Sequence, residues 1–186
     1  MKEKKISVYI PSLLDGYEFC HPINQDDFEN INVQVNGLPR VGSWKPIVMR
    51  IIREDEGRKL LESDSPWLGS HALMFRSRAT DVLGPMMRDC GELLPIACNG
   101  ADISLFNPTR VIDALDEAAS SVLRFSDKQI MRINRHVFRS DAIRDVHFFK
   151  IPNLRVSPTF VSEHVVELWK TSGLRGLEFK QVWSSR

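Results

Sequence analysis

The most regular pattern of apolar and polar positions lies between residues 78 and 90 and predicts an amphipathic helix. Its apolar positions recur every three or four residues: Ala79, Val82, Leu83, Met86, Met87 and Cys90. Ser77 stands where an N-cap is expected, and Gly91 stands where helices commonly end. Gly84-Pro85 falls inside the pattern. We therefore expect a kink, because proline removes a backbone hydrogen bond and its ring crowds the preceding turn.

A second amphipathic helix is predicted between residues 163 and 172, with Gly173 as its end. Its apolar side contains Val161, Val165, Leu168 and Trp169. Its polar side contains Glu163, His164 and Glu167, and the last two can touch because they are three residues apart. Two ligands do not make a zinc site, and the chain has no HExxH motif. We interpret this pair as the hydrated surface of an ordinary helix.

Shorter apolar runs bounded by turn residues predict strands and hairpins. Strands are expected in ISVYI, which Pro11 would stop, and in INVQV, KPIVMRIIRE, VHFFKIP and LEFKQVW. Asn99-Gly100 and Ser126-Asp127 each lie between two apolar runs, which indicates a hairpin at each site. The segment SDAIRD predicts a short helix. Antiparallel hairpins with a few short helices are typical of an α+β fold.

One boundary is indicated near Ser65, where a run of alternating charges, REDEGRKLLESDSP, ends in a proline turn. We predict a strand-rich N-terminal segment over residues 1–65, which could form a subdomain. An α+β domain is predicted over residues 66–186.

The composition excludes several classes of protein. The 186 residues include 25 Lys and Arg against 24 Asp and Glu, a net charge of +1, which makes nucleic acid an unlikely partner. A basic stretch from Arg124 to Arg155 nevertheless keeps a weakly basic nucleic-acid-binding module open as an alternative. No apolar run approaches the roughly 18 residues of a membrane span. The three cysteines are typical of a reduced, cytoplasmic compartment.

No motif for catalysis, metal or cofactor binding is found in the chain. The GxSxG, GxxxxGK[ST] and GxGxxG motifs are absent, and no CxxC pair occurs. Cys90 and Cys98 are interpreted as buried, inert thiols. A small enzyme with an unrecognised site remains an alternative, and its residues would be Cys20, His21, His71 or His164. We assign no catalytic residue, no metal and no cofactor.

Several sequence blocks occur together between residues 67 and 183: FRSRATDVLGPMMRDCGELLPIAC, LFNPTRVIDALDE, INRHVFR, FFKIPN and SPTFVSEHVVELWKTSGLRGLEFKQVW. In this order they resemble the bacterial immunity protein eleven family of polymorphic toxin systems, formerly a domain of unknown function. The resemblance implies a cytoplasmic antitoxin that binds and neutralises one cognate toxin domain, which is often a nuclease. It implies no enzymatic activity, and the family offers no catalytic residues to carry over.

Two acidic groups lie outside these blocks, in the segment where partner specificity is expected. They are the predicted toxin-contact residues: Asp26, Asp27, Glu29, Glu54, Asp55 and Glu56. Their carboxylates would complement a basic toxin surface. The sequence predicts no oligomeric state.

Overall fold

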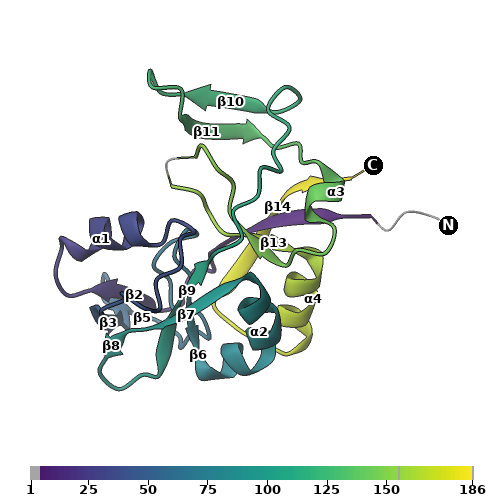
Figure 1. Ribbon diagram of the computed structural model, residues 1–186. Helices are drawn as coiled ribbons and strands as arrows, with labels where there is room; N and C mark the ends of the chain where they lie inside the picture. Colours follow the sequence, from purple (N-terminus) through teal and green to yellow (C-terminus); the bar gives the residue numbers. More distant parts are fainter. Residues whose placement is uncertain (1–4, 155, 186) are drawn as a thin grey trace.

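The computed structural model describes residues 5–154 and 156–185, and Figure 1 shows the arrangement of their helices and strands. Within these residues the helices are α1 (Asp27–Gln34), α2 (Ser77–Cys90), α3 (Ser140–Ile143) and α4 (Glu163–Thr171). The strands form small sheets in which all but one of the pairings between neighbouring strands are antiparallel. The predicted α+β class is confirmed.

A four-stranded antiparallel sheet joins the two ends of the chain. Its order is β12 (Phe148–Phe149), β13 (Phe160–Ser162), β1 (Ser7–Leu13) and β14 (Leu177–Ser184). The N-terminal strand therefore lies between two C-terminal strands. The division at Ser65 stays a prediction, although this sheet contains strands from both sides of it.

A three-stranded antiparallel sheet separates two of the hydrophobic cores. It consists of β6 (Met74–Arg76), β9 (Ile103–Pro108) and β7 (Gly91–Pro95), in that order. Side chains alternate along each strand, so neighbours belong to opposite faces. Phe106 packs into the core beneath α2 and α4, whereas Leu105 packs into the core beneath α1.

Three clusters of buried side chains make up the core. The first lies between α2, α4 and both sheets and includes Leu83, Phe106, Val165 and Trp169. The second includes Ile31, Val35, Met49 and Leu105. The third covers the other face of the four-stranded sheet and includes Val8, Phe138, Phe149 and Phe160. The four-stranded sheet and the β6–β9–β7 sheet each have buried side chains on both faces, so both contribute to two clusters.

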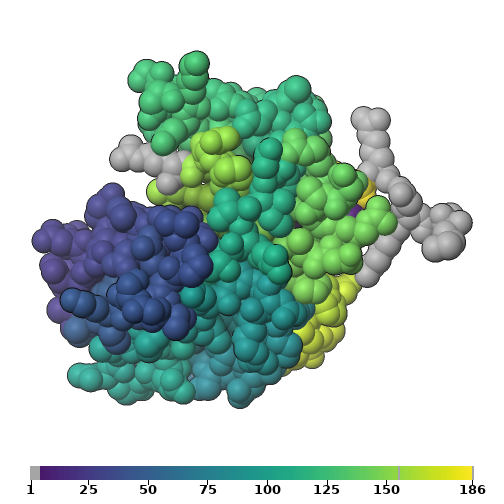
Figure 2. All heavy atoms as spheres, in the orientation of Figure 1, coloured from purple at the N-terminus to yellow at the C-terminus, as the bar shows by residue number. Residues whose placement is uncertain are grey.

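The remaining strands are short and lie toward the edges of the molecule. A mixed sheet contains β2 (Phe19–Pro22), β3 (Val48–Ile52) and β8 (Ala97–Cys98), with β3 and β8 parallel. Two hairpins pair β4 (Glu54–Asp55) with β5 (Arg58–Lys59) and β10 (Ser121–Arg124) with β11 (Ile130–Arg135). In Figure 2 the residues around α1, coloured purple to blue, gather on one side of the visible face.

Both predicted long helices are present, but their ends differ in detail from the prediction. Helix α2 begins at Ser77, so its N-cap position is Arg76, and it runs through Pro85 to Cys90. Gly91 has an extended backbone, with φ 177°, and is the first residue of β7 instead of a left-handed cap. Helix α4 does end as predicted: Gly173 has φ 66°, and the Leu174 N–H donates to the Trp169 carbonyl.

The prediction of a strand in INVQV was wrong, because these residues belong to α1. The segment has apolar side chains at positions 31, 33 and 35, which is also the spacing of a strand. Ile31 and Val35 are buried, as expected for residues four apart on one helix face, whereas Val33 is exposed. The alternation was therefore coincidental.

One further strand prediction needs correction, and the two hairpin predictions are confirmed. Strand β1 does not stop at Pro11 but continues to Leu13. Strand β13 pairs only with Val8 and Tyr9, so the side of β1 that faces β13 is unpaired at Pro11 and tolerates the missing proline N–H. The β10–β11 hairpin is present. Strands β7 and β9 also pair, but the chain between them leaves to form β8 beside β3 before it turns at Gly100.

The close approach of two strands at Gly91 generates a prediction for stability. A Cβ at this position would overlap the carbonyl oxygen of Asn107 and lie 2.8 Å from the Cα of Pro108. We expect Gly91→Ala to lower the free energy of unfolding by about 1–3 kcal/mol, because backbone must move to make room. Urea denaturation measures this change. Gly42→Ala is the control, since a Cβ there meets nothing within 4 Å; equal stabilities of the two variants would contradict the packing at Gly91.

Candidate functional site

The six acidic residues predicted as toxin contacts lie on two separate elements. Asp26 directly precedes α1, and Asp27 and Glu29 lie in its first turn. Glu54 and Asp55 form β4, and Glu56 lies in the turn that leads to β5, with φ 48°. Asp27 is half-buried, and the other five are exposed.

The two acidic groups differ in how far nearby cations neutralise them. Across the β4–β5 hairpin, Glu54 faces Lys59 and Asp55 faces Arg58. The carboxylates of Asp15, Asp55 and Glu56 raise the pKa of Arg58, with Asp15 contributing most.

Near α1 the neighbours of the carboxylates are amides. The Asn30 amide donates to Asp27, and the Asn32 amide donates to Glu29. Among the described residues, no ion pair includes a member of either acidic group. The groups differ because Arg58 and Lys59 lie on the strand that pairs with the second group.

Sequence reasoning missed the apolar residues that surround α1. Ile23, Val33, Leu38, Val41 and Val48 are large hydrophobic residues, and each is between 54% and 64% exposed. The sequence contained one signal for these residues. If the segment is a helix, Val33 lies on the same side as Glu29 and Asn30, which are four and three residues before it, so it would be exposed. It was assigned to a strand, so its exposure could not be foreseen.

A hollow of about 530 Å³ lies beside the N-terminus of α4 and contains the His164 and Glu167 side chains. The segment 144–147 and the start of β1 form its other walls. His147, which sequence reasoning did not single out, has its ring 5.4 Å from that of His164. Within the described part of the chain, no cluster of three or more His, Cys, Asp or Glu residues could hold a metal ion.

The polar groups of this hollow bind one another. The Tyr9 hydroxyl donates to Glu163 at 3.4 Å, and burial, followed by the charges of Glu163 and Glu167, raises the pKa of Tyr9. His147 Nδ1 lies 3.1 Å from the Ser162 hydroxyl. This contact explains why Ser162 makes no capping bond to α4. The hollow combines apolar and polar residues, and the contact between His147 and Ser162 joins the segment before β12 to the end of β13.

Of the groups named for the enzyme alternative, the Cys20 thiol is buried and the rings of His21 and His71 are half-buried. Burial raises the pKa of the Cys20 thiol, and the adjacent Cys98 raises it further, whereas a nucleophilic thiol needs a lowered pKa. His21 packs against Phe28, and burial lowers its pKa. Burial and the Lys150 charge lower the pKa of His71 to about 4.

The basic stretch from Arg124 onward is largely engaged by its own chain; Arg155, its last member, lies outside the described residues. Arg124 pairs with Glu117, and Arg135 donates to the Ala119 carbonyl. Arg139 pairs with Asp113. These contacts reduce the cationic surface that the nucleic-acid alternative requires.

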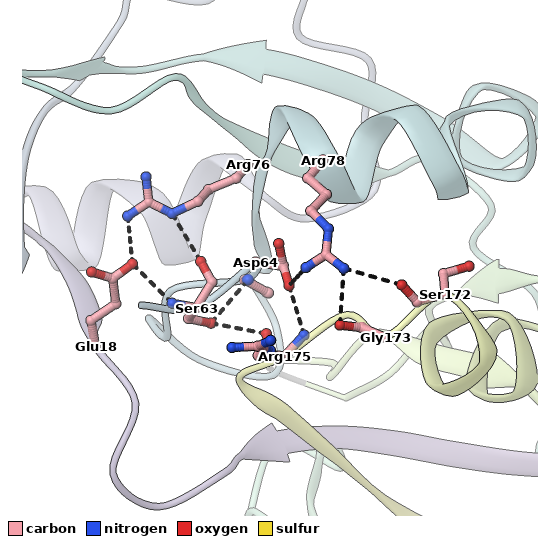
Figure 3. A network of polar contacts seen from close by, with 9 residues as sticks. Glu18, Ser63, Asp64, Arg76, Arg78, Ser172, Gly173 and Arg175 are labelled. Atoms are coloured by element: carbon pink, nitrogen blue, oxygen red, sulfur yellow. Dashed lines mark hydrogen bonds and ion pairs between the residues drawn. The ribbon is translucent and has the colours of Figure 1, made fainter. Parts of the chain in front are cut away.

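A buried network anchors the segment 63–65 to the N-terminal part of the chain (Figure 3). Glu18 is fully buried, and its Oε1 accepts hydrogen bonds from Arg76 at 2.5 Å and from the Ser63 N–H at 3.1 Å. Its Oε2 lies 3.4 Å from Arg53 Nε. Two guanidinium groups thus offset the cost of burying this carboxylate.

The same network reaches the loop after α4. Asp64 accepts from Arg78 at 2.9 Å and from the Arg175 backbone N–H at 2.7 Å. Arg78 also donates to the carbonyls of Ser172 and Gly173, as Figure 3 shows. The carboxylates hold backbone and guanidinium groups of their own chain. We therefore assign the network to positioning of the fold.

Lys150 is a buried cation with no carboxylate partner in the described part of the chain. Its Nζ donates to the carbonyls of His71 and Ser157, both at 2.9 Å. Burial lowers its pKa to about 7. The side chain therefore connects β12 to the segment 70–72 and to the loop that precedes β13.

Among the residues the structure describes, no helix is long and apolar enough to cross a membrane.

Comparison with known proteins finds a match in the second half of the chain. Residues 98–184 match the model of the immunity protein family (Imm11) and are called the immunity-family segment. The predicted resemblance is confirmed over these residues. No curated protein matches the chain. The matched segment contains α3, α4 and three strands of the four-stranded sheet, whereas α1 lies outside it.

The buried pair of Glu18 and Arg76 generates a second prediction. Glu18→Gln leaves the guanidinium buried without its counter-ion, so we expect the free energy of unfolding to fall by about 3–5 kcal/mol. The matched control is Asp15→Asn, which removes an exposed pair with Arg58 and should leave stability nearly unchanged. Urea denaturation compares the two. Equal effects would show that Glu18 is not a buried anchor.

A third prediction concerns the pH dependence of stability at Lys150. Its pKa is about 7 in the folded protein but near 10.5 in the unfolded chain, so between these values the unfolded chain binds more protons. The free energy of unfolding should therefore rise with pH above 7, whereas below pH 7 the Lys150 titration adds no pH dependence because both states are protonated.

Lys150→Met removes this titration and serves as the reference. The difference in stability, wild type minus variant, should increase between pH 7 and pH 9, as measured by urea denaturation at each pH. A difference that stays constant over this range would contradict the account of Lys150.

Proposed function

We propose that the protein is a cytoplasmic immunity protein that binds a cognate toxin domain and neutralises it by protein–protein contact. The observation that carries the proposal is the family match over residues 98–184, which supports an immunity role. The toxin, in this proposal, is the product of a polymorphic toxin system, and a nuclease domain is the form that best suits the acidic surface. No bond is made or broken by the immunity protein.

The surface chemistry agrees with this mode of action. A nuclease binds an anionic substrate, so its active face is cationic, and an inhibitor that covers this face needs negative charge. We propose the six acidic residues identified from the sequence as toxin contacts: Asp26, Asp27, Glu29, Glu54, Asp55 and Glu56. A folded scaffold that presents them in fixed positions loses little entropy on binding.

Co-expression tests the proposal directly. The C-terminal domain of the protein encoded by the neighbouring gene is expressed from an inducible promoter, with or without the immunity protein, and colony counts are compared. We expect the domain alone to arrest growth and the pair to grow normally. A non-cognate toxin domain is the control for specificity. Growth arrest that persists with the immunity protein present, together with no complex in gel filtration, would refute the proposal.

A further inference from the structure

We propose that α1 and the loops beside it form the surface that receives the basic face of the toxin domain; this inference rests on the proposed immunity function. The surface is called the α1 surface and is defined by eight residues: Ile23, Asp26, Asp27, Glu29, Val33, Leu38, Val41 and Val48.

The apolar part of the α1 surface is unusual in its concentration. Ten large hydrophobic residues are exposed in the described part of the chain, and five of them fall between residues 23 and 48. Single exposed hydrophobic residues are ordinary, whereas a group of them around one short helix is typical of an interaction site. Exclusion of water from these five side chains would favour binding.

Hydrogen bonds hold these apolar residues around the helix. The Ile23 N–H donates to the Val48 carbonyl at 3.0 Å, which joins the segment before α1 to β3. Arg40 Nε donates to the Gln34 carbonyl at 3.0 Å and returns the following loop to the end of α1. The Arg40 N–H also donates to Glu92 on β7 at 2.7 Å. The loop that carries Leu38 and Val41 is therefore presented in a fixed conformation.

Charge identifies the occupant as a cationic protein surface. Asp26, Asp27 and Glu29 form no ion pair within the described residues, so a partner can neutralise them. The same carboxylates repel nucleic acid and anionic lipid. A protein face that combines Lys or Arg side chains with apolar ones complements both parts of the surface, and the charges would also accelerate encounter.

A second copy of this chain fits the α1 surface poorly. In a two-fold dimer the same patch faces itself, so the three carboxylates of one copy would lie against those of the other. Acidic residues in the first turn also interact favourably with the helix dipole of α1. That local effect accounts for the acids but not for the exposure of Val33 and Leu38, which a toxin-binding role does explain.

The α1 surface continues onto the immunity-family segment. Val111 packs against Gly37, where a Cβ would overlap its side chain. Val111 is itself exposed, and it lines a hollow of about 660 Å³ whose other lining residues include both acids and the arginines Arg110 and Arg144. A toxin domain seated on α1 can therefore also contact the segment that matches the family. The N-terminal residues would supply specificity, and the family segment would supply the shared part of the interface.

Two sets of substitutions test the apolar and acidic parts separately. The first, Val33→Ser with Leu38→Ser, removes exposed apolar side chains. The second, Asp26→Lys with Asp27→Lys and Glu29→Lys, reverses the charge beside them. The probe is the inactivated C-terminal domain of the neighbouring gene's product, and its dissociation constant is measured by calorimetry at low and high salt.

We expect each set to raise the dissociation constant by roughly tenfold or more, as truncation of central interface residues does. In the charge-reversed protein, added salt should no longer weaken binding and should strengthen it, because the new lysines repel the cationic face and salt screens that repulsion. Circular dichroism confirms that each variant is folded. The melting curve of each variant shows how much the lost helix-dipole interaction lowers the stability of the protein, which separates that effect from binding.

Matched controls come from two other exposed sites. Leu123→Ser with Met131→Ser alters the β10–β11 hairpin, where both side chains are comparably exposed. Asp81→Lys with Glu178→Lys reverses two exposed carboxylates on α2 and β14, neither of which is a proposed toxin contact. Both controls should bind within about threefold of wild type, because each lies on elements apart from α1.

The outcomes distinguish this inference from the proposed function. Wild type that binds while both α1 sets bind equally well would overturn the α1 surface and leave the immunity function intact. Loss of affinity in a control alone would also overturn the α1 surface. So would sedimentation of the wild type as a dimer that the Val33 and Leu38 substitutions dissociate. Wild type that shows no binding and no protection would refute the immunity function, and the α1 surface with it.

Discussion

Two buried carboxylates hold the parts of this protein together. Glu18 and Asp64 are nearly free of solvent, a state that costs free energy unless hydrogen-bond donors replace the lost water. Arginine side chains from β6 and α2, and backbone N–H groups from the segment 63–65 and the loop after α4, provide those donors. Because these donors come from distant parts of the sequence, the network fixes the N-terminal residues, and the α1 surface with them, against the immunity-family segment.

Local sequence signals were reliable where one pattern excluded another. Three signals each had one structural interpretation. They are the helical spacing of apolar residues in α2, the glycine Gly173 that ends α4, and the Ser126-Asp127 turn. Local signals failed where one spacing of apolar residues fits both a strand and a helix. In INVQV the residues became helical because Ile31 and Val35 are buried on one side, and that burial depends on tertiary contacts. Gly91 is required by the close approach of Asn107 and Pro108, a distance that no local pattern contains.

The candidate site was predictable in part. Acidic residues outside the family blocks could be named from the sequence, but their neutralisation could not, because Arg58 and Lys59 face the second group only through the β4–β5 pairing. Exposed Val33 and Leu38 could not be distinguished from core residues before α1 was known to be a helix. The buried ammonium of Lys150 depends on the carbonyls of His71 and Ser157. His71 is distant in the sequence and Ser157 lies in a loop, so no sequence pattern predicts the burial of Lys150.

The central claim is that the protein acts by covering a toxin with the α1 surface, and hydrogen–deuterium exchange of the complex tests it most directly. Amide exchange is measured for the free protein and for the protein bound to the inactivated toxin domain. The account predicts slower exchange on binding in residues 23–41. Unchanged exchange there, with protection confined to the β10–β11 hairpin or the hollow beside α4, would contradict it.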